Sequence, residues 1–415
     1  MSIVFPSVDA SIVARRDEII AGLASLVSPE ALITSEDERR PYDSDALTAF
    51  RRLPLAVVLP STTEEVSAVL RYCHTHGIPV IPRGSGTSLV GGSTPQEDAV
   101  VVGLSRMNRL LAIDYPNRTA TVQAGVTNLA ITGAVRHEGF FYAPDPSSQL
   151  ACSIGGNIAM NSGGAHCLKY GVTTNNLLGV KVVMLDGTIV EVGGSFLDAE
   201  GYDFLGLIVG SEGQIVIVTE ATVRILHAAE AARPVLFGFS KAEFAGAAVS
   251  GIIAAGIIPV AIEYMDKMAI EICESFTKSG YPMDAEALLI IEVEGSEDEI
   301  EQQLATIIGI AKRHGVTTIK KSRSAMETAA IWKGRKSAFG ATGRIADYIC
   351  MDGTIPTGRL TEALAGIDAL VRRCAKCCEH PIWRYRDGDR MRRGGPCRSP
   401  GGSHGWRRSH HRGRY

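Results

Sequence analysis

The chain has 415 residues, which is too many for one hydrophobic core and predicts at least two domains. Hydrophobic residues make up 45% and charged residues 21%, an ordinary globular composition that excludes a chain disordered throughout. Only 6% of the residues are aromatic, whereas 44 are glycine, so the composition argues against an aromatic nucleic-acid platform and favours many tight turns.

The net charge of −3 combines two different compositions. Residues 381–415 hold ten Arg and two Asp, a charge of +8, which leaves −11 for the first 380 residues. No hydrophobic periodicity survives beyond about residue 380, so we expect 379–415 to be a basic, disordered tail. A tail that binds nucleic acid or anionic lipid is one interpretation. A metal cluster at Cys374-x-x-Cys377-Cys378 with His380 is another, although no second such motif occurs.

The nine cysteines are odd in number and scattered, which favours reduced thiols in a cytoplasmic protein. The first residues lack a basic segment followed by an apolar one, so we expect no signal peptide. No apolar run approaches the length of about 18 residues that a membrane-spanning helix needs, so we expect no transmembrane span.

Residues 1–50 are predicted to be an N-terminal helical segment, with helical spacing over 12–27. The next domain, 51–228, is predicted as α+β. It opens with a strand at Ala56–Leu59, a helix that starts at Ser61–Glu64 and ends near Gly77, and a strand at Val80-Ile81. Further strands are expected at 100–102, 119–123, 180–185, 188–192, 215–219 and 221–225, with a hairpin turn at Asp186-Gly187.

Residues 229–378 are predicted to form a second domain in the order strand, helix, strand, strand, helix, strand. The expected elements are Val235–Phe239, 241–256, Val260–Tyr264, Leu288–Val293, 296–315 and Val316–Lys320. This order suits an antiparallel sheet with helices on one face, a ferredoxin-like arrangement.

Three glycine-rich segments occur in the first domain: 82–92, 144–164 and 210–213. Glycines let consecutive backbone N–H groups turn toward an anion, and the hydroxyls of Ser85, Thr87 and Ser88 add donors, so the first segment suits a pyrophosphate. It lacks the Lys of a Walker A motif and the helix of a Rossmann fingerprint. A plain surface loop explains the first segment equally well, but three such loops in one domain are hard to explain as turns alone.

These segments resemble a known family of flavoproteins. PRGSGTSLVGG, PDPSSQLACSIGGNIAMNSGG and VGSEGQIVIVTEATVRI are similar to the FAD-binding domain of the vanillyl-alcohol oxidase, or PCMH-type, superfamily. IWKGRKSAFGATGRIADYICMDGTIP (331–356) resembles the glycolate oxidase FAD subunit and the FAD-linked D-lactate dehydrogenases more closely. The resemblance covers about residues 10–375. It implies a PCMH-type FAD-binding domain followed by a substrate domain that is incomplete after about residue 376.

The resemblance also implies the residues that bind FAD. The first loop would wrap the pyrophosphate, the second would follow the ribityl–isoalloxazine part, and the third would contact the adenine end. The implied residues are Arg83, Gly84, Ser85, Gly86, Thr87, Ser88, Gly91, Gly92, Pro144, Ser148, Ser153, Gly155, Asn157, Ser162, Glu212, Ile217 and Val218. His74 and His76 precede the first loop, where covalent relatives carry a histidine, so we expect non-covalent FAD. His166 is interpreted as a loop residue, with a place beside the flavin as the alternative.

The implied reaction is oxidation of a 2-hydroxy acid, of the glycolate or D-lactate class, to the 2-oxo acid. Arg335 is the candidate for binding the substrate carboxylate, because a guanidinium binds carboxylate bidentately. A solvated basic face shared with Lys333 and Lys336 is the alternative. The histidine motifs of the family are missing, so the catalytic residue stays unknown and no metal is predicted. We expect electrons to leave through an iron–sulfur or second flavin subunit of a glycolate oxidase-type complex, or a quinone-linked acceptor, with the chain cytoplasmic or peripheral to the inner membrane.

The tail has a third interpretation in the light of this resemblance. If the codons of Trp406–Arg414 are read one nucleotide forward, one permitted choice of codons encodes Gly-Gly-Gly-Arg-Ile-Thr-Gly-Glu. This is close to a stretch of the family that comes just before a histidine missing from this chain. We therefore expect the tail to be frameshifted sequence, which the nucleotide sequence tests. Two rival functions remain: a catalytically impaired FAD-binding protein, and a non-enzymatic anion binder that acts through its tail.

Overall fold

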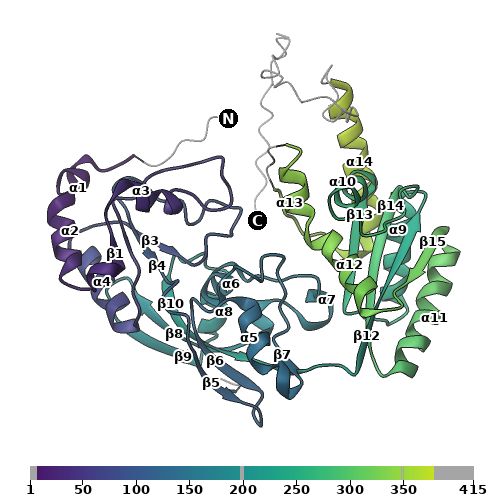
Figure 1. Ribbon diagram of the computed structural model, residues 1–415, viewed down its shortest axis with the longest axis horizontal. Coiled ribbons are helices and arrows are strands. Elements are labelled where there is room, and N and C mark those ends of the chain that lie inside the picture. Colours follow the sequence, from purple (N-terminus) through teal and green to yellow (C-terminus); the bar gives the residue numbers. More distant parts are fainter. Residues whose placement is uncertain (1–6, 197–200, 347, 349, 378–415) are drawn as a thin grey trace, which may run out of the picture. The chain divides into compact units, whose positions relative to one another are not determined.

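The structure is a computed structural model that describes residues 7–196, 201–346, 348 and 350–377 (Figure 1). Met1–Thr354 form one compact unit and Ile355–Tyr415 form another. In the second unit, the described part consists of a 3-10 turn (Thr357–Arg359) and α14 (Leu360–Cys377). The basic tail and the Cys378 and His380 of the candidate metal cluster lie outside the described residues.

The N-terminal segment contains two short helices where the sequence predicted one. They are α1 (Ala10–Ala14), which Asp9 caps, and α2 (Arg16–Ala24). The backbone of Arg15 leaves the helical region, with ψ of +14°, and this separates them. Ile12, Ile19 and Leu23 are buried with the first sheet and α4 in one core cluster. The spacing that suggested one helix therefore comes from two helices that bury the same face.

The first sheet has the order β1-β2-β4-β3, with β2, β4 and β3 parallel. Its strands are β1 (Leu32–Ile33), β2 (Ala56–Val58), β3 (Val80–Arg83) and β4 (Val100–Gly103). Helix α4 (Thr63–Thr75) connects β2 to β3, and Thr62 Oγ1 caps it by accepting from the N–H of Glu65 at 3.1 Å. The predicted β-α-β opening is confirmed, and it delivers the first glycine loop directly from the end of β3.

The second sheet is antiparallel, with the order β5-β6-β10-β8-β9. Its strands are β5 (Leu110–Asp114), β6 (Thr119–Gln123), β8 (Leu177–Met184), β9 (Ile189–Gly193) and β10 (Val216–Arg224). The hairpin at Asp186-Gly187 is confirmed, with Gly187 at φ +85°. The two strands predicted at 215–219 and 221–225 are one strand, β10, whose pairing with β8 shifts register between Val218 and Glu220.

Short elements lie between the strands of these two sheets or follow the last of them. They are α3 (Glu36–Arg39), α5 (Asn128–Val135), β7 (Phe140–Phe141), α6 (Ile154–Met160), α7 (Cys167–Tyr170), α8 (Phe204–Ile208) and β11 (Leu226–His227). β7 and β11 pair with each other as a two-stranded sheet. Ile154 and Ile158 of α6 are fully buried in the core of the second sheet. The α6 part of the second glycine-rich segment therefore belongs to the core, whereas Leu150 of the same segment is exposed.

The C-terminal sheet is antiparallel, with the order β13-β14-β12-β15. Its strands are β12 (Ala231–Phe239), β13 (Ala261–Asp266), β14 (Ala287–Gly295) and β15 (Val316–Lys321), with α9 (Ala242–Ala254) and α11 (Glu297–Arg313) as predicted. Figure 1 shows the helices around this sheet. The sequence reading missed α10 (Lys267–Thr277), which Asp266 caps by accepting from the N–H of Ala269 at 2.8 Å.

The prediction that helices cover only one face of this sheet is wrong. Leu288 and Ile290 of β14 form a core cluster with Ile270 of α10 and Ile331 of α12 (Ala325–Lys336). β14 is buried on both faces along most of its length, so apolar and polar side chains do not alternate along it as they do in a strand with one face in solvent. α13 (Ala338–Gly343) follows α12. No helix in the described ranges is long and apolar enough to cross a bilayer.

Candidate functional site

The three glycine-rich segments converge on one cavity of about 300 Å³. Eleven of the predicted cofactor residues line it: Gly84, Ser85, Gly86, Thr87, Ser88, Gly92, Ser148, Ser153, Asn157, Ser162 and Glu212. Cys350 and Asp352, from the segment after α13, line it as well. Sequence positions more than 250 residues apart thus share one wall, which local sequence patterns alone do not reveal.

The first loop presents unused donors to this cavity. The backbone amides of Ser85, Gly86 and Thr87 donate to no other described residue. Gly86 has φ +69°, and a Cβ there would lie 2.2 Å from Arg83 Nη2, so only glycine fits. Ser93 Oγ is buried at the cavity wall and has no hydrogen-bond partner in the described part of the chain. Groups of this kind are stable when a ligand supplies the missing partner.

The second and third segments pack tightly against the first and against each other. A Cβ on Gly84 would lie 2.4 Å from Ser153 Oγ, the hydroxyl that caps α6. The amide of Glu212 donates to the carbonyl of Ala159 at 2.8 Å. Glu212 itself adopts φ +55°, a strained conformation for a residue with a side chain. The close approaches explain why small residues recur in all three segments.

Arg83 and Gly91 have structural partners. The Arg83 guanidinium donates to the carbonyls of Ser44 at 2.8 Å and Pro41 at 3.2 Å, and burial lowers its pKa. The Gly91 amide donates to Asp45 Oδ2 at 2.8 Å. Neither residue lines the cavity, so these groups hold the N-terminal segment against the loop.

Pro144, Gly155, Ile217 and Val218 also lie outside the lining of this cavity. The Pro144 carbonyl accepts from Asn128 Nδ2 at 3.0 Å, and Gly155 lies so close to Ala124 that a Cβ would approach its Cβ to 2.9 Å. Val218 is buried in the core of the second sheet. Ile217 lines a second cavity of about 600 Å³, which also has Glu212 and His74 in its wall.

Arg335 is ion-paired within the C-terminal half of the chain. Its Nε–H donates to Glu263 Oε2 of β13 at 2.6 Å, so one edge of the guanidinium is occupied. Arg335 does not line the cavity. Its neighbour Lys336 lies 3.5 Å from Asp145 Oδ2, three residues before the lining residue Ser148. α12 is therefore linked to a segment that forms the cavity wall.

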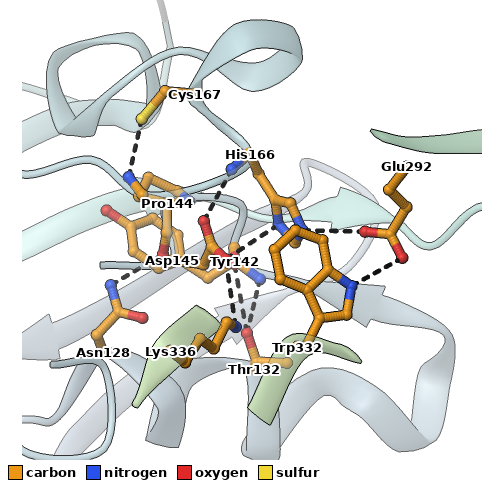
Figure 2. Close-up of polar contacts among 11 residues, drawn as sticks. Asn128, Thr132, Tyr142, Pro144, Asp145, His166, Cys167, Glu292, Trp332 and Lys336 are labelled. Carbon is orange, nitrogen blue, oxygen red and sulfur yellow. Dashed lines mark hydrogen bonds and ion pairs between the residues drawn. The ribbon is translucent and has the colours of Figure 1, made fainter. Parts of the chain in front are cut away.

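His166 lies at the centre of a charged cluster that the sequence did not predict (Figure 2). Its Nδ1 is 3.6 Å from Asp145 Oδ2, and its Nε2 is 3.7 Å from Glu292 Oε2. The Trp332 indole N–H donates to Glu292 Oε1 at 3.3 Å, and its ring meets the imidazole edge-on. The side chains of Asp145 and Glu292 are each only 8% exposed.

The carboxylates decide the charge of His166. Burial by itself lowers the pKa of the imidazole, but the carboxylates of Glu292 and Asp145, which face its two ring nitrogens, outweigh it, so the pKa is raised. Lys336 opposes this effect. The only sequence signals for the cluster are the buried-strand setting of Glu292 and the position of His166 after two glycines, and neither identifies its partner.

Comparison with known proteins identifies the class. Residues 54–193 match the FAD binding domain family, and residues 228–380 match the family of FAD linked oxidases, C-terminal domain. The chain therefore belongs to the FAD-linked oxidases, which are oxidoreductases that use FAD, and it has the PCMH-type fold.

Individual relatives refine the comparison. The glycolate oxidase subunit GlcD of Escherichia coli (strain K12) is 45% identical over 356 residues, which are 86% of this chain and 71% of GlcD. The D-lactate dehydrogenase of Archaeoglobus fulgidus is 37% identical over 268 residues, 64% of this chain and 60% of that protein. A crystal structure of p-cresol methylhydroxylase with substrate bound shares the fold, with a TM-score of 0.65 at 16% identity over 81% of this chain and 72% of that one.

The residues present suit FAD. Free amides on a glycine loop bind anions such as a pyrophosphate, and the partnerless Ser93 hydroxyl in the same wall is a further donor. Where Cβ atoms would clash, the segments carry glycine, which leaves room for a large ligand against the backbone. The donor set of the cavity therefore fits the cofactor of the family.

Proposed function

We propose that this chain oxidises a 2-hydroxy acid, of the glycolate or D-lactate class, to the 2-oxo acid with bound FAD. The observation that carries the proposal is the convergence of the three glycine-rich segments on one cavity that the 350–352 segment of the C-terminal half also lines. The names of two relatives, a glycolate oxidase subunit and a D-lactate dehydrogenase, give the substrate class.

We assign FAD binding to the eleven cavity-lining residues named above and to Ser93. The amides of Ser85, Gly86 and Thr87 would donate to the pyrophosphate, and Glu212 with Ile217 would bound the adenine end in the neighbouring cavity. FAD supplies the hydride acceptor when bound. His74 lies in the helix before the first loop, so the proposal is for non-covalent FAD.

Arg335 is the proposed ligand of the substrate carboxylate. Glu263 occupies its Nε edge, which leaves the end-on pair of Nη groups for a second carboxylate. No side chain is assigned as the base that removes the hydroxyl proton. Loss of a general base costs about 10²- to 10⁴-fold in rate on general grounds, so a chain without one would bind FAD and substrate but turn over slowly. The electron acceptor is proposed to be an iron–sulfur or second flavin subunit, or a quinone.

Purification and spectroscopy test the function. We expect a yellow protein whose FAD is released by acid precipitation and whose flavin bleaches when glycolate or D-lactate is added without oxygen. A yellow protein that does not bleach would indicate an impaired FAD-binding protein. A folded but colourless protein that takes up no added FAD would contradict the proposal.

A pair of variants on one helix tests the substrate residue. Arg335→Met removes the proposed carboxylate ligand and should weaken binding of pyruvate, a 2-oxo acid, at least tenfold. Lys333→Met, an exposed lysine on the same helix, is the matched control and should bind pyruvate normally. Pyruvate affinity can be measured from the change in flavin absorbance, which requires no turnover.

A further inference from the structure

His166 and Asp145 join two segments of the cavity wall. The His166 amide donates to Asp145 Oδ1 at 3.0 Å, and Nδ1 faces the other carboxylate oxygen. Asp145 precedes Ser148 by three residues, and His166 follows Ser162 by four; both serines line the cavity. Gly164, two residues before His166, packs so closely on Asp145 that a Cβ would be 2.0 Å from the Asp145 carbonyl oxygen. The pair is therefore part of a rigid wall.

Glu292 connects this wall to the C-terminal domain. One of its oxygens faces His166 Nε2 at 3.7 Å, and the other accepts from the Trp332 indole N–H at 3.3 Å. Trp332 and Arg335 lie on the same helix, α12, three residues apart. His166 thus reaches α12 through one buried carboxylate, and Lys336 reaches the wall directly through Asp145.

The geometry favours the imidazolium form of His166. Both ring nitrogens face carboxylate oxygens, and in a neutral ring one of them would point a lone pair at an anion. Other charged groups nearby have their own partners. Lys169 pairs with Glu294 at 2.8 Å, the Tyr170 hydroxyl donates to the same Glu294, and Arg335 pairs with Glu263. Cys167, the next residue, has its thiol against the Gly164 amide, and burial raises its pKa.

We propose that His166 is a positioning residue that fixes α12, and with it Arg335, against the wall of the FAD cavity by joining Asp145 to Glu292. The inference rests on the proposed role of Arg335 as the carboxylate ligand. It assigns no contact between His166 and substrate. Its consequence is that the affinity for the 2-oxo or 2-hydroxy acid depends on His166, whereas FAD binding does not.

The first test measures the helix itself. We expect His166→Gln to increase hydrogen exchange of the α12 amides at pH 6, at least tenfold, with no change in β12. Glu292→Gln keeps an acceptor for Trp332 but removes the charge, and should act in the same direction. His137→Gln is the matched control, because His137 is an exposed histidine whose contacts among the described residues are an ion pair with its neighbour Glu138 and an edge-on ring contact with Tyr115.

The second test measures pyruvate binding to the FAD-loaded chain, from the flavin absorbance. We expect His166→Gln to weaken pyruvate binding about tenfold at pH 6, with FAD content unchanged. The pyruvate affinity of this variant should also change less between pH 6 and pH 9 than that of the unsubstituted chain. The imidazole attracts a carboxylate at each of its two nitrogens only while it is positively charged. The affinity of the unsubstituted chain for pyruvate should therefore fall as the pH rises.

Each combination of results has one meaning. Faster exchange in α12 together with weaker pyruvate binding supports the proposal. Unchanged exchange in His166→Gln overturns it, whatever the binding shows. Faster exchange with unchanged pyruvate affinity also overturns it, because the helix would then be fixed without positioning Arg335. If Arg335→Met binds pyruvate normally, the proposed function fails at its substrate residue, and the exchange data still report separately on His166.

Discussion

Arg335 donates from Nε to Glu263 Oε2 at 2.6 Å, so the proposed carboxylate ligand already holds a carboxylate of its own. Arg335 is 30% exposed at its side chain and Glu263 17%, so the pair is only partly screened by solvent. Glu263 therefore has two opposing effects on an anionic substrate: it orients the guanidinium and it cancels part of its charge.

Glu263→Gln separates these two effects. The amide oxygen can still accept from Arg335, but the negative charge is gone, so pyruvate should bind more tightly, by about 1 kcal/mol or roughly fivefold. Titration of the flavin absorbance measures this. Glu301→Gln removes a carboxylate that pairs with Arg233 and Lys321 on the same domain, and serves as the control. Weaker binding by Glu263→Gln would show that orientation matters more than charge.

Gly86→Ala should abolish tight FAD binding. The residue has φ +69°, and its Cβ would lie 2.2 Å from Arg83 Nη2, in a guanidinium that is itself held by the carbonyls of Ser44 and Pro41. The loop must shift, and its amides then lose their alignment. FAD content after gel filtration is the measurement. Gly133→Ala is the control, because Gly133 is inside α5 with open space around it and should gain roughly 0.5–1 kcal/mol of stability.

Gly164→Ala should disrupt the wall that carries His166. The added Cβ would lie 2.0 Å from the Asp145 carbonyl, and backbone cannot move aside as a flexible side chain can. We expect a lower melting temperature and loss of FAD. Gly340→Ala in α13, where no atom lies within 4 Å of the added Cβ, should leave both unchanged. A Gly164→Ala chain that retained FAD and stability would contradict the described packing of this wall.

Much of the fold could be predicted because short stretches of sequence determine many of its elements. The cap at Thr62, the Asp186-Gly187 turn and the buried valines of β4 each identify their element without reference to distant residues. No element was predicted between Tyr264 and Leu288, so helix α10 was missed although its cap at Asp266 follows the same rule. The prediction of one covered face overlooked a signal in the C-terminal sheet: the apolar run Leu288–Ile291 leaves β14 no polar face, which is typical of a strand covered on both sides.

The site divides in the same way. The glycine segments were found because their chemistry is local: small residues and hydroxyls at consecutive positions. The ties of Arg83 to Ser44, of Lys336 to Asp145 and of His166 to Glu292 join residues 39, 191 and 126 positions apart, and no local pattern specifies them. The basic tail stays a prediction, because residues 378–415 lie outside the part of the chain that the structure describes.

The stability of the folded chain should depend on pH through His166. Its pKa is raised in the folded state because Glu292 and Asp145 outweigh the effect of burial. The stabilisation is therefore complete below the unfolded-state pKa of about 6.5 and disappears as the pH rises through the higher folded-state pKa. We expect His166→Gln to lower the melting temperature by about 2 °C at pH 6, equivalent to roughly 1 kcal/mol, and by less at pH 9. His137 is exposed, so the melting temperature of His137→Gln should differ from that of the unsubstituted chain by the same amount at pH 6 and at pH 9. A difference between His166→Gln and the unsubstituted chain that stayed constant from pH 6 to pH 9 would mean that the imidazole is neutral, and that packing against Trp332 is its main contribution.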